Sequence, residues 1–361
     1  MIQREKHSYS EEQHLSVAQL EAQVGNLITD TNPHLTADVT SRQIMGTVVV
    51  ALLPIVIASG YYFSWRIYGL YLLSIVTAQI AEIIWFKARG RELTFDLSAV
   101  VTGLLLTMNL PPSAPWYFPV IGSAFAIIVV KEFFGGLGYN FLNPALGGRA
   151  FLVGLFYMEM FQISWPDPPF GRIPPGAVSQ ATADVTTHAT PLAALKAGQA
   201  LSGDELLDMF LGNTGGRIGE TSAVLIIVAA VFLIWRRIIR PHIPLIMVAV
   251  VAMGAWLFAE PGSLASGTTV LGHVLGGGLL LGAVFMATDY ASSPSTLVGE
   301  CVYAMGIGLL VVILRFWGPT NEGVSYAILT MNCFVPLIDR LLRRRVLGEP
   351  GNHQLNIKID K

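Results

Sequence analysis

Two glycine-bearing apolar stretches that end in polar breaks decide the fold: LSAVVTGLLLTMNL at residues 97–110 and TVLGHVLGGGLLLGAVFMAT at residues 269–288. Pro111 and Pro112 follow the first stretch, and Asp289 with a polar run follows the second. The first is short for a full crossing, since a membrane-spanning helix needs about 20 apolar residues. Paired interrupted helices in corresponding places of two halves are typical of transport folds, where they form a central site. The alternative interpretation is that glycine-rich helices simply pack closely together.

The composition of the whole chain is that of a membrane protein. Of its 361 residues, 13% are charged and 53% are hydrophobic, and the mean hydropathy is +0.58. Soluble domains carry about twice that charged fraction. These figures exclude a soluble enzyme and a disordered segment, and the net charge of −2 excludes a nucleic-acid binder. Two cysteines exclude a disulfide framework and a four-cysteine metal centre made by this chain alone.

Ten apolar stretches predict ten transmembrane helices, because lipid offers no partner for open backbone groups. Their expected bounds are 43–63, 67–87, 97–110, 116–134, 144–162, 221–238, 242–259, 269–288, 299–317 and 323–341. They form two groups of five, at 43–162 and 221–341, separated by a polar loop at 163–220. An odd number of spans per group inverts the second half relative to the first. We therefore predict an all-α integral membrane protein with two inverted five-helix halves.

The distribution of lysine and arginine predicts the orientation of these spans. With the N-terminus in the cytoplasm, 17 of the 22 basic residues fall on the inner side. The outer side keeps Arg66, Arg172, Lys196, Arg217 and Arg315. Cytoplasmic loops of membrane proteins carry such an excess. We expect residues 1–42 and the tail at 342–361 to be cytoplasmic, and the loop at 163–220 to lie outside.

The outer loop contains the signals of a short capped helix. Thr190 is expected at the N-cap, Pro191 at the first helical position and Gly198 after the last turn. A phosphate esterified to a hydroxyl at the N-cap would sit where the helix dipole favours anions. Taken alone, the pattern more often marks an ordinary capped surface helix.

Polar residues within or beside the apolar stretches are a second class of candidates, since they are costly in lipid and usually face a cavity or a partner. A cation path requires oxygen ligands. The residues that could supply them are Asp96, Thr102, Asn109, Asn143 and Asp289. The alternative is a structural role at interfaces and helix ends. Further acidic residues in the spans are Glu82, Glu132, Glu159, Glu300 and Asp339.

Several motifs occur in an order that resembles a known membrane family. They are DLSAVVTGLLL at 96–106, NLPP at 109–112, KEFFGGLG at 131–138, NPA at 143–145, GETS at 219–222, FMATD at 285–289 and EGV at 322–324. This sequence resembles the family of the Rnf complex D subunit over roughly residues 31–342. The homologous B subunit of the sodium-pumping NADH:quinone oxidoreductase belongs to the same family.

The resemblance implies a flavin cofactor. In this family, FMN is joined through its phosphate to the last threonine of the motif Asp-x-x-(Ser/Thr)-Gly-Ala-Thr. Residues 184–190 match at Asp184, Thr187, Ala189 and Thr190, and depart at His188, where glycine is usual. We therefore expect covalent FMN on Thr190, and the resemblance also implies a noncovalent riboflavin. A cofactor is required for electron transfer, because no side chain of this sequence can hold one electron reversibly at a useful potential.

The function that the resemblance implies is that of a flavin-bearing subunit in an electron-transport complex of the inner membrane. Such a complex couples ferredoxin:NAD electron transfer to Na⁺ or H⁺ translocation, and the subunit is not catalytic alone. The expected partners are the A, B, C, E and G subunits, a flavin transferase for maturation and membrane lipid. Two alternatives stay open, a B-type subunit of the quinone-reducing complex and a redox-free transporter. The residues are equally compatible with Na⁺ and H⁺.

Overall fold

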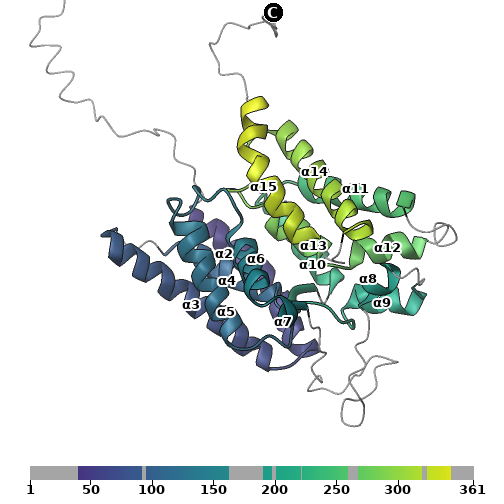
Figure 1. The fold of residues 1–361 in the computed structure, drawn as a ribbon, viewed down its shortest axis with the longest axis horizontal. Coiled ribbons are helices and arrows are strands. Elements are labelled where there is room, and N and C mark those ends of the chain that lie inside the picture. The colour runs from purple at the N-terminus through teal and green to yellow at the C-terminus, as the bar shows by residue number, and fades with distance from the viewer. Residues whose placement is uncertain are drawn as a thin grey trace, which may run out of the picture. The chain divides into compact units, whose positions relative to one another are not determined.

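The structure, a computed structural model, describes residues 40–91, 95–161, 190–196, 201–220, 222–258, 267–318 and 323–342. Every regular element within these ranges is a helix. The predicted all-α class is confirmed for this part of the chain. Figure 1 shows the helices in chain order, from purple through teal and green to yellow.

The first group of helices runs from residue 41 to residue 161. It comprises α2 (Ser41–Tyr62), α3 (Arg66–Arg89), α4 (Ser98–Met108), α5 (Tyr117–Phe125), the π-helix η1 (Ala126–Glu132), α6 (Pro144–Leu155) and α7 (Tyr157–Phe161). Helix α3 packs against α4 and α5, and α5 packs against α6. Asn143 caps α6 by accepting a hydrogen bond from the backbone nitrogen of Leu146.

The second group runs from residue 191 to residue 341. It comprises α8 (Pro191–Lys196), α9 (Gly203–Leu211), η2 (Ile218–Glu220), α10 (Ala223–Trp235), α11 (His242–Phe258), α12 (Gly267–Leu275), α13 (Leu279–Leu281), the π-helix η3 (Gly282–Met286), α14 (Leu297–Phe316) and α15 (Val324–Leu341). Helix α11 packs against α12 and α14, and α14 packs against α15. The two groups meet where α2 contacts α10 and where α6 contacts α15 (Figure 1).

All ten predicted apolar stretches contain helix, but their lengths differ. Within the described ranges, four helices are long and apolar enough to cross a membrane: α2, α3, α14 and α15. A fifth candidate is α12 with the segment Leu279–Met286, bent by 55° at the break between them. Helices α4, α6, α10 and α11 are apolar but shorter. The structure thus has four to five candidate spans, and ten crossings in two inverted halves stay a prediction.

The second decisive stretch contains a bend in addition to the polar break that ends it. The helical segment ends at Met286, before Thr288 and Asp289, as the sequence predicts, and a bend that the sequence did not predict falls earlier, at Gly276–Gly278, between α12 and α13. Gly277 and Gly278 both have positive φ, 66° and 65°, which glycine adopts without steric cost. Leu97, the residue before α4, has φ 66°. That conformation is costly for a leucine, so the surrounding structure must hold it there.

Part of the segment predicted as an outer loop packs as core. Leu192, Leu195, Leu201, Leu206 and Met209 form a small buried cluster, against which Leu275 of α12 also packs. Ser202 and Glu205 form a capping box at the start of α9. Helices α8 and α9 are therefore fastened to the interrupted span rather than separate from it.

Small residues allow close approach between α6 and its neighbours. A Cβ at Gly148 would lie 2.7 Å from the carbonyl oxygen of Gly122 and 3.0 Å from the Cβ of Ala126. In lipid, helix association depends strongly on such contacts, because burying apolar groups from lipid gives little driving force. Gly154, in the same helix, faces open space.

We expect Gly148→Ala to destabilise the protein by about 1–3 kcal/mol, because the added methyl group forces α5 and α6 apart. Gly154→Ala, the matched control, should leave stability unchanged or raise it by up to about 1 kcal/mol, since alanine is the better helix former. Thermal unfolding of both variants in detergent measures the difference. Equal behaviour of the two variants would contradict the close packing at Gly148.

Candidate functional site

Thr190 stands at the start of α8, as predicted. Its hydroxyl accepts a hydrogen bond from the backbone nitrogen of Ala193 at 3.2 Å, and its carbonyl accepts one from Ala194 at 2.9 Å. Thr190 therefore caps α8, and Pro191 occupies the first helical position. The other motif residues, Asp184, Thr187, His188 and Ala189, lie outside the described residues, as does Gly198.

A small hollow adjoins Thr190 and brings two of the sequence features together. Thr190 and Pro191 form one wall, and Gly276 and Gly277 of the α12–α13 break form another. The remaining lining residues are Leu192, Met209, Thr214, Gly215, Gly216, Glu220 and Leu275. A Cβ at Gly278 would lie 2.6 Å from Oε1 of Glu220, so the break must be free of side chains for Glu220 to sit there. The candidate attachment residue thus lies beside the interrupted span, which the sequence did not predict.

Arg315 holds the broken end of α12. Its guanidinium donates hydrogen bonds to the carbonyl oxygens of Gly276 at 2.9 Å and of Gly277 at 3.4 Å, and also to that of His273. The last carbonyls of a helix have no partner within the helix and carry partial negative charge, so a cation is favourable there. Arg315 is 3% exposed.

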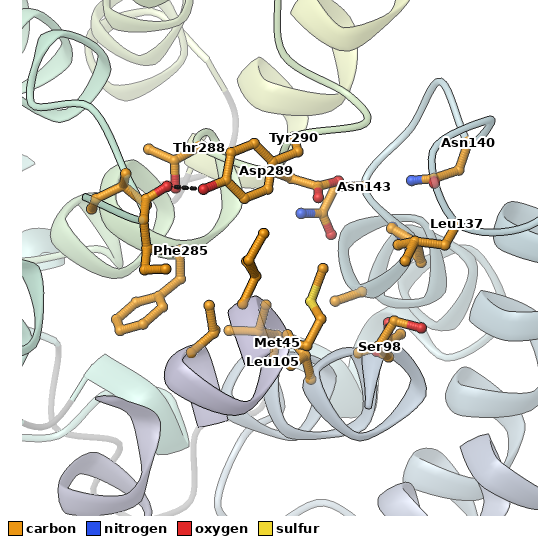
Figure 2. A pocket seen from close by; sticks show the side chains of 18 of the residues that line it. Met45, Ser98, Leu105, Leu137, Asn140, Asn143, Phe285, Thr288, Asp289 and Tyr290 are labelled. Carbon is orange, nitrogen blue, oxygen red and sulfur yellow. Dashed lines mark hydrogen bonds between the residues drawn. The ribbon is translucent and has the colours of Figure 1, made fainter. Parts of the chain in front are cut away.

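A cavity of about 80 Å³, lined by apolar residues and a smaller number of polar ones and with room for several water molecules, lies at the other candidate site. Three of the five residues predicted for an ion path line it: Thr102 of α4, Asn143 at the start of α6, and Asp289 after η3. Figure 2 shows Asn143 and Asp289 among the side chains around it. Asp96 stands next to it through Ser98, whose backbone nitrogen and hydroxyl donate to Oδ1 of Asp96 at 2.9 and 2.5 Å.

Asp289 is partly buried in the wall of this cavity. The hydroxyl of Ser292 donates to its carboxylate at 3.0 Å. Burial raises the pKa of the Asp289 carboxyl above its ordinary value, while hydrogen bonds from Ser292, the backbone of Ala291 and Asn140 act in the opposite direction. Next to it, the Tyr290 hydroxyl donates to the carbonyl oxygen of Ile238, as the dashed line in Figure 2 marks.

The fifth predicted residue, Asn109, lies outside the cavity lining, at the far end of α4. Its amide nitrogen donates to Leu105 O at 2.6 Å and contacts the sulfur of Met286 at 3.7 Å. Asn143 reaches the same methionine from the cavity, donating to Met286 O at 3.2 Å. Met286 therefore links the end of α4 to the cavity wall, although the five predicted residues do not form one site.

Two buried arginines surround Asn109. Arg149 of α6 donates to Oδ1 of Asn109 at 3.1 Å and to the hydroxyl of Ser325 on α15. Arg217 donates to the backbone carbonyl of Asn109 at 3.1 Å. These contacts join the two groups of helices at their centre. Sequence reasoning missed both roles, although each arginine is a lone charge within or beside an apolar stretch, a pattern that indicates a polar role inside a membrane protein.

Four of the basic residues that were counted to predict the orientation are buried inside the protein and therefore do not indicate it. Lys131, Arg149, Arg217 and Arg315 are all 6% exposed or less. A side chain inside the protein does not report on the charge of a loop, so the count of inner against outer basic residues becomes 15 against 3. The asymmetry persists, and the sidedness of the loops and termini stays a prediction.

We expect Arg315→Met to destabilise the protein by about 1–3 kcal/mol, since it leaves buried carbonyls at the α12–α13 break without their donor. Arg340→Met, which changes an exposed arginine of α15, should shift stability by less than about 0.5 kcal/mol. Thermal unfolding in detergent compares them. Similar losses in both variants would show that the carbonyl contacts of Arg315 contribute little.

Comparison with known proteins covers most of the chain. The NQR2, RnfD, RnfE family matches residues 28–348. The D subunit of the Na⁺-translocating ferredoxin:NAD⁺ oxidoreductase complex of Acetobacterium woodii is 42% identical over 326 residues, which cover 90% of this chain and 96% of that protein. The D subunit of the proton-translocating complex of Clostridium ljungdahlii is 37% identical over 331 residues, 89% of this chain and 96% of that protein.

A third relative is named without a specified ion. The D subunit of the ion-translocating oxidoreductase complex of Stutzerimonas stutzeri is 39% identical over 325 residues, 85% of this chain and 92% of that protein. Matches of this extent run through both groups of helices and the segment between them. The chain belongs to the NQR2, RnfD, RnfE family.

Proposed function

We propose that this chain is the D subunit of a membrane-bound, ion-translocating ferredoxin:NAD⁺ oxidoreductase complex. The observation that carries this is the match to D subunits of such complexes over 85–90% of the chain. The apolar helices α2, α3, α14 and α15 agree with a multi-pass membrane subunit. The chain contributes to an oxidoreductase of the translocase type and works with other subunits, for which we propose the A, B, C, E and G subunits in the inner membrane.

We further propose that Thr190 carries FMN through a phosphoester bond. Residues 184–190 supply the motif, and the partly buried hydroxyl of Thr190 adjoins the hollow at the α12–α13 break. Gly277 lines the hollow and has no side chain, so the guanidinium of Arg315 lies close to the hollow. A Cβ on Gly277 would be 2.7 Å from this guanidinium. Its positive charge would favour a phosphoester, whereas Glu220 would oppose it. FMN would supply the capacity to accept and pass electrons, which the side chains lack. A noncovalent riboflavin remains part of this proposal.

We also propose that the two helix groups are inverted halves around an ion path. The second and fourth apolar stretches pack together in each group, as α3 with α5 and as α11 with α14. In each group the third stretch contains a short helix that begins directly after a residue with φ near 65°, Leu97 or Gly278. Thr102, Asn143 and Asp289 around one cavity support a path for the coupling cation.

We expect Thr190→Val to abolish in-gel flavin fluorescence at the 39.0 kDa mass of this chain, because valine has no hydroxyl to esterify. Thr214→Val, in the lining of the same hollow, is the matched control and should keep the fluorescence. The measurement is a denaturing gel of membranes from cells that also express the flavin transferase. Fluorescence that survives in Thr190→Val would refute the attachment site, and a dark wild-type band would favour a redox-free transporter.

We expect Asp289→Asn to lower cation uptake per electron transferred by about tenfold or more. Removing the carboxylate charge should cost at least about 1.4 kcal/mol of cation-binding free energy, which corresponds to a tenfold loss of affinity. The readout is uptake of radioactive Na⁺ and of protons by liposomes with the full complex, with electron transfer recorded in parallel. Asp204→Asn, on the exposed side of α9, controls for the loss of one acidic group. Unchanged coupling in Asp289→Asn would exclude this carboxylate from the path.

A further inference from the structure

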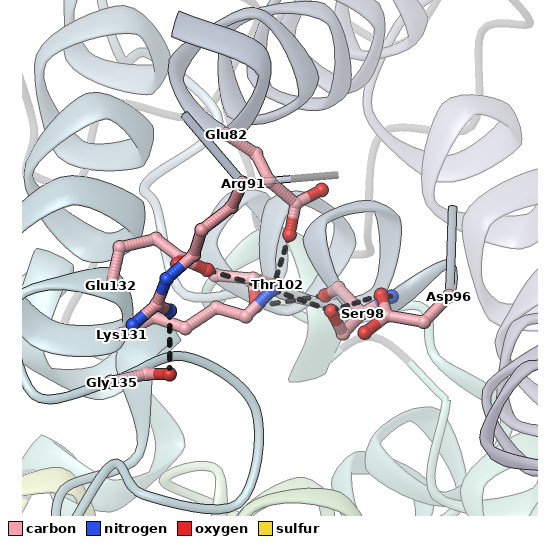
Figure 3. A network of polar contacts seen from close by, with 8 residues as sticks. All are labelled: Glu82, Arg91, Asp96, Ser98, Thr102, Lys131, Glu132 and Gly135. Carbon is pink, nitrogen blue, oxygen red and sulfur yellow. Dashed lines mark hydrogen bonds and ion pairs between the residues drawn. The ribbon is translucent and has the colours of Figure 1, made fainter. Parts of the chain in front are cut away.

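A buried cluster of charged side chains lies where α3, η1 and the start of α4 meet (Figure 3). The ammonium of Lys131 is 2.5 Å from Oε1 of Glu82, 2.6 Å from the hydroxyl of Ser98 and 3.6 Å from Oε1 of Glu132. Lys131, Glu82 and Glu132 are exposed by 4% or less. The cluster touches the cavity of about 80 Å³ described above, because Lys131, Ser98 and Thr102 all line it.

Glu132 differs from its neighbours in what its carboxylate contacts. Neither of its oxygens accepts a hydrogen bond from any residue that the structure describes. The turn after η1 covers it with bare backbone: Gly136 has φ 95°, and a Cβ there would lie 3.4 Å from Oε2 of Glu132. The amides of this turn are already used, since Gly135 N donates to Glu132 O and Gly136 N to Lys131 O, each at 3.1 Å.

The charges around Glu132 do not balance in its fully ionised state. Two buried glutamates, Glu82 and Glu132, face the ammonium of Lys131. The partly buried Asp96 accepts a hydrogen bond from the neutral hydroxyl of Ser98, which leaves its charge in place, and the exposed Arg91 donates to the carbonyl oxygen of Gly135 at 3.3 Å (Figure 3). Among the described residues this leaves one buried negative charge in excess at the Lys131 cluster. An uncompensated buried charge is costly, and one bound proton removes it.

We propose that Glu132 takes up and releases one proton beside the Lys131–Glu82 ion pair, with the cavity as its access route. An O–H bond forms at the Glu132 carboxylate with a proton from cavity water, and the same bond breaks on release, without any redox change. This inference rests on the proposed function, because proton exchange at a buried site serves coupling in an ion-translocating complex.

The first test uses the unmodified complex in its membrane. Dicyclohexylcarbodiimide reacts with protonated carboxyl groups in apolar surroundings, and mass spectrometry of the chain locates the adduct. We expect labelling of Glu132 that rises as the pH falls and that does not respond to Na⁺. Absence of labelling at every pH would overturn the proposal, and so would protection by Na⁺, which would identify a metal cation as the occupant.

The second test compares Glu132→Gln with Glu300→Gln in the full complex reconstituted in liposomes. Glutamine keeps the size of the side chain and cannot release a proton. We expect proton uptake during electron transfer to slow about a hundredfold in Glu132→Gln, the scale on which a positioned proton-transferring group contributes. Glu300 is also buried, at 6% exposed, but it pairs with Arg240 at 2.7 Å and does not contact the Lys131 cluster, so Glu300→Gln should retain wild-type uptake. Wild-type uptake and pH dependence in Glu132→Gln would refute the assignment.

Two further readouts separate this inference from the proposed function. Flavin fluorescence of the chain and electron transfer by the wild-type complex test the function alone, and they do not depend on Glu132. If both are present while Glu132 is neither labelled nor needed, the inference on Glu132 fails and the proposed function stands. If the wild-type chain has no flavin and its complex no electron transfer, the proposed function fails first.

Discussion

A helix that is interrupted inside a membrane protein exposes backbone carbonyls and amides that lipid cannot satisfy, so the protein must supply their partners. Here Arg315 does this for the end of α12, donating to the carbonyls of Gly276 and Gly277. The need to satisfy these carbonyls also determines where α14 lies in the second group of helices. Arg315 belongs to α14, so α14 must lie beside the break, and Gly277, which presents one of these carbonyls, has a positive φ.

The same requirement explains the centre of the structure. The end of α4 directs Asn109 into the interior, where Arg149 and Arg217 provide donors for its side chain and its backbone carbonyl. Arg149 also reaches Ser325 on α15, so one guanidinium connects helices from both groups. Such contacts are directional, whereas apolar packing is not. They therefore specify how the helices are arranged more narrowly than the apolar surfaces around them.

Hydropathy was sufficient to predict that each of the ten apolar stretches contains helix, because each apolar run is bounded by polar or basic residues. It could not predict the bend at Gly276–Gly278, since three consecutive glycines are compatible with close packing as well as with a break. Nor could it predict that Thr190 lies beside that bend, because the contact joins residues far apart in the sequence. The arginines were missed for a related reason. Arg217 and Arg315 were counted as outer charges, and their partners include backbone carbonyls, which no sequence pattern marks.

The packing of α8 on α12 has a mechanical consequence. Thr190 begins a helix whose leucines, Leu192 and Leu195, belong to the same buried cluster that Leu275 of α12 completes. The residue at the start of α8 cannot keep its position if the interrupted span shifts, because the shared cluster carries the two together. A group tethered at Thr190 would then change its distance to any neighbouring electron carrier whenever α12 moves. Electron tunnelling weakens steeply with distance, so the tether would convert a displacement of the span into a change in the rate of electron flow.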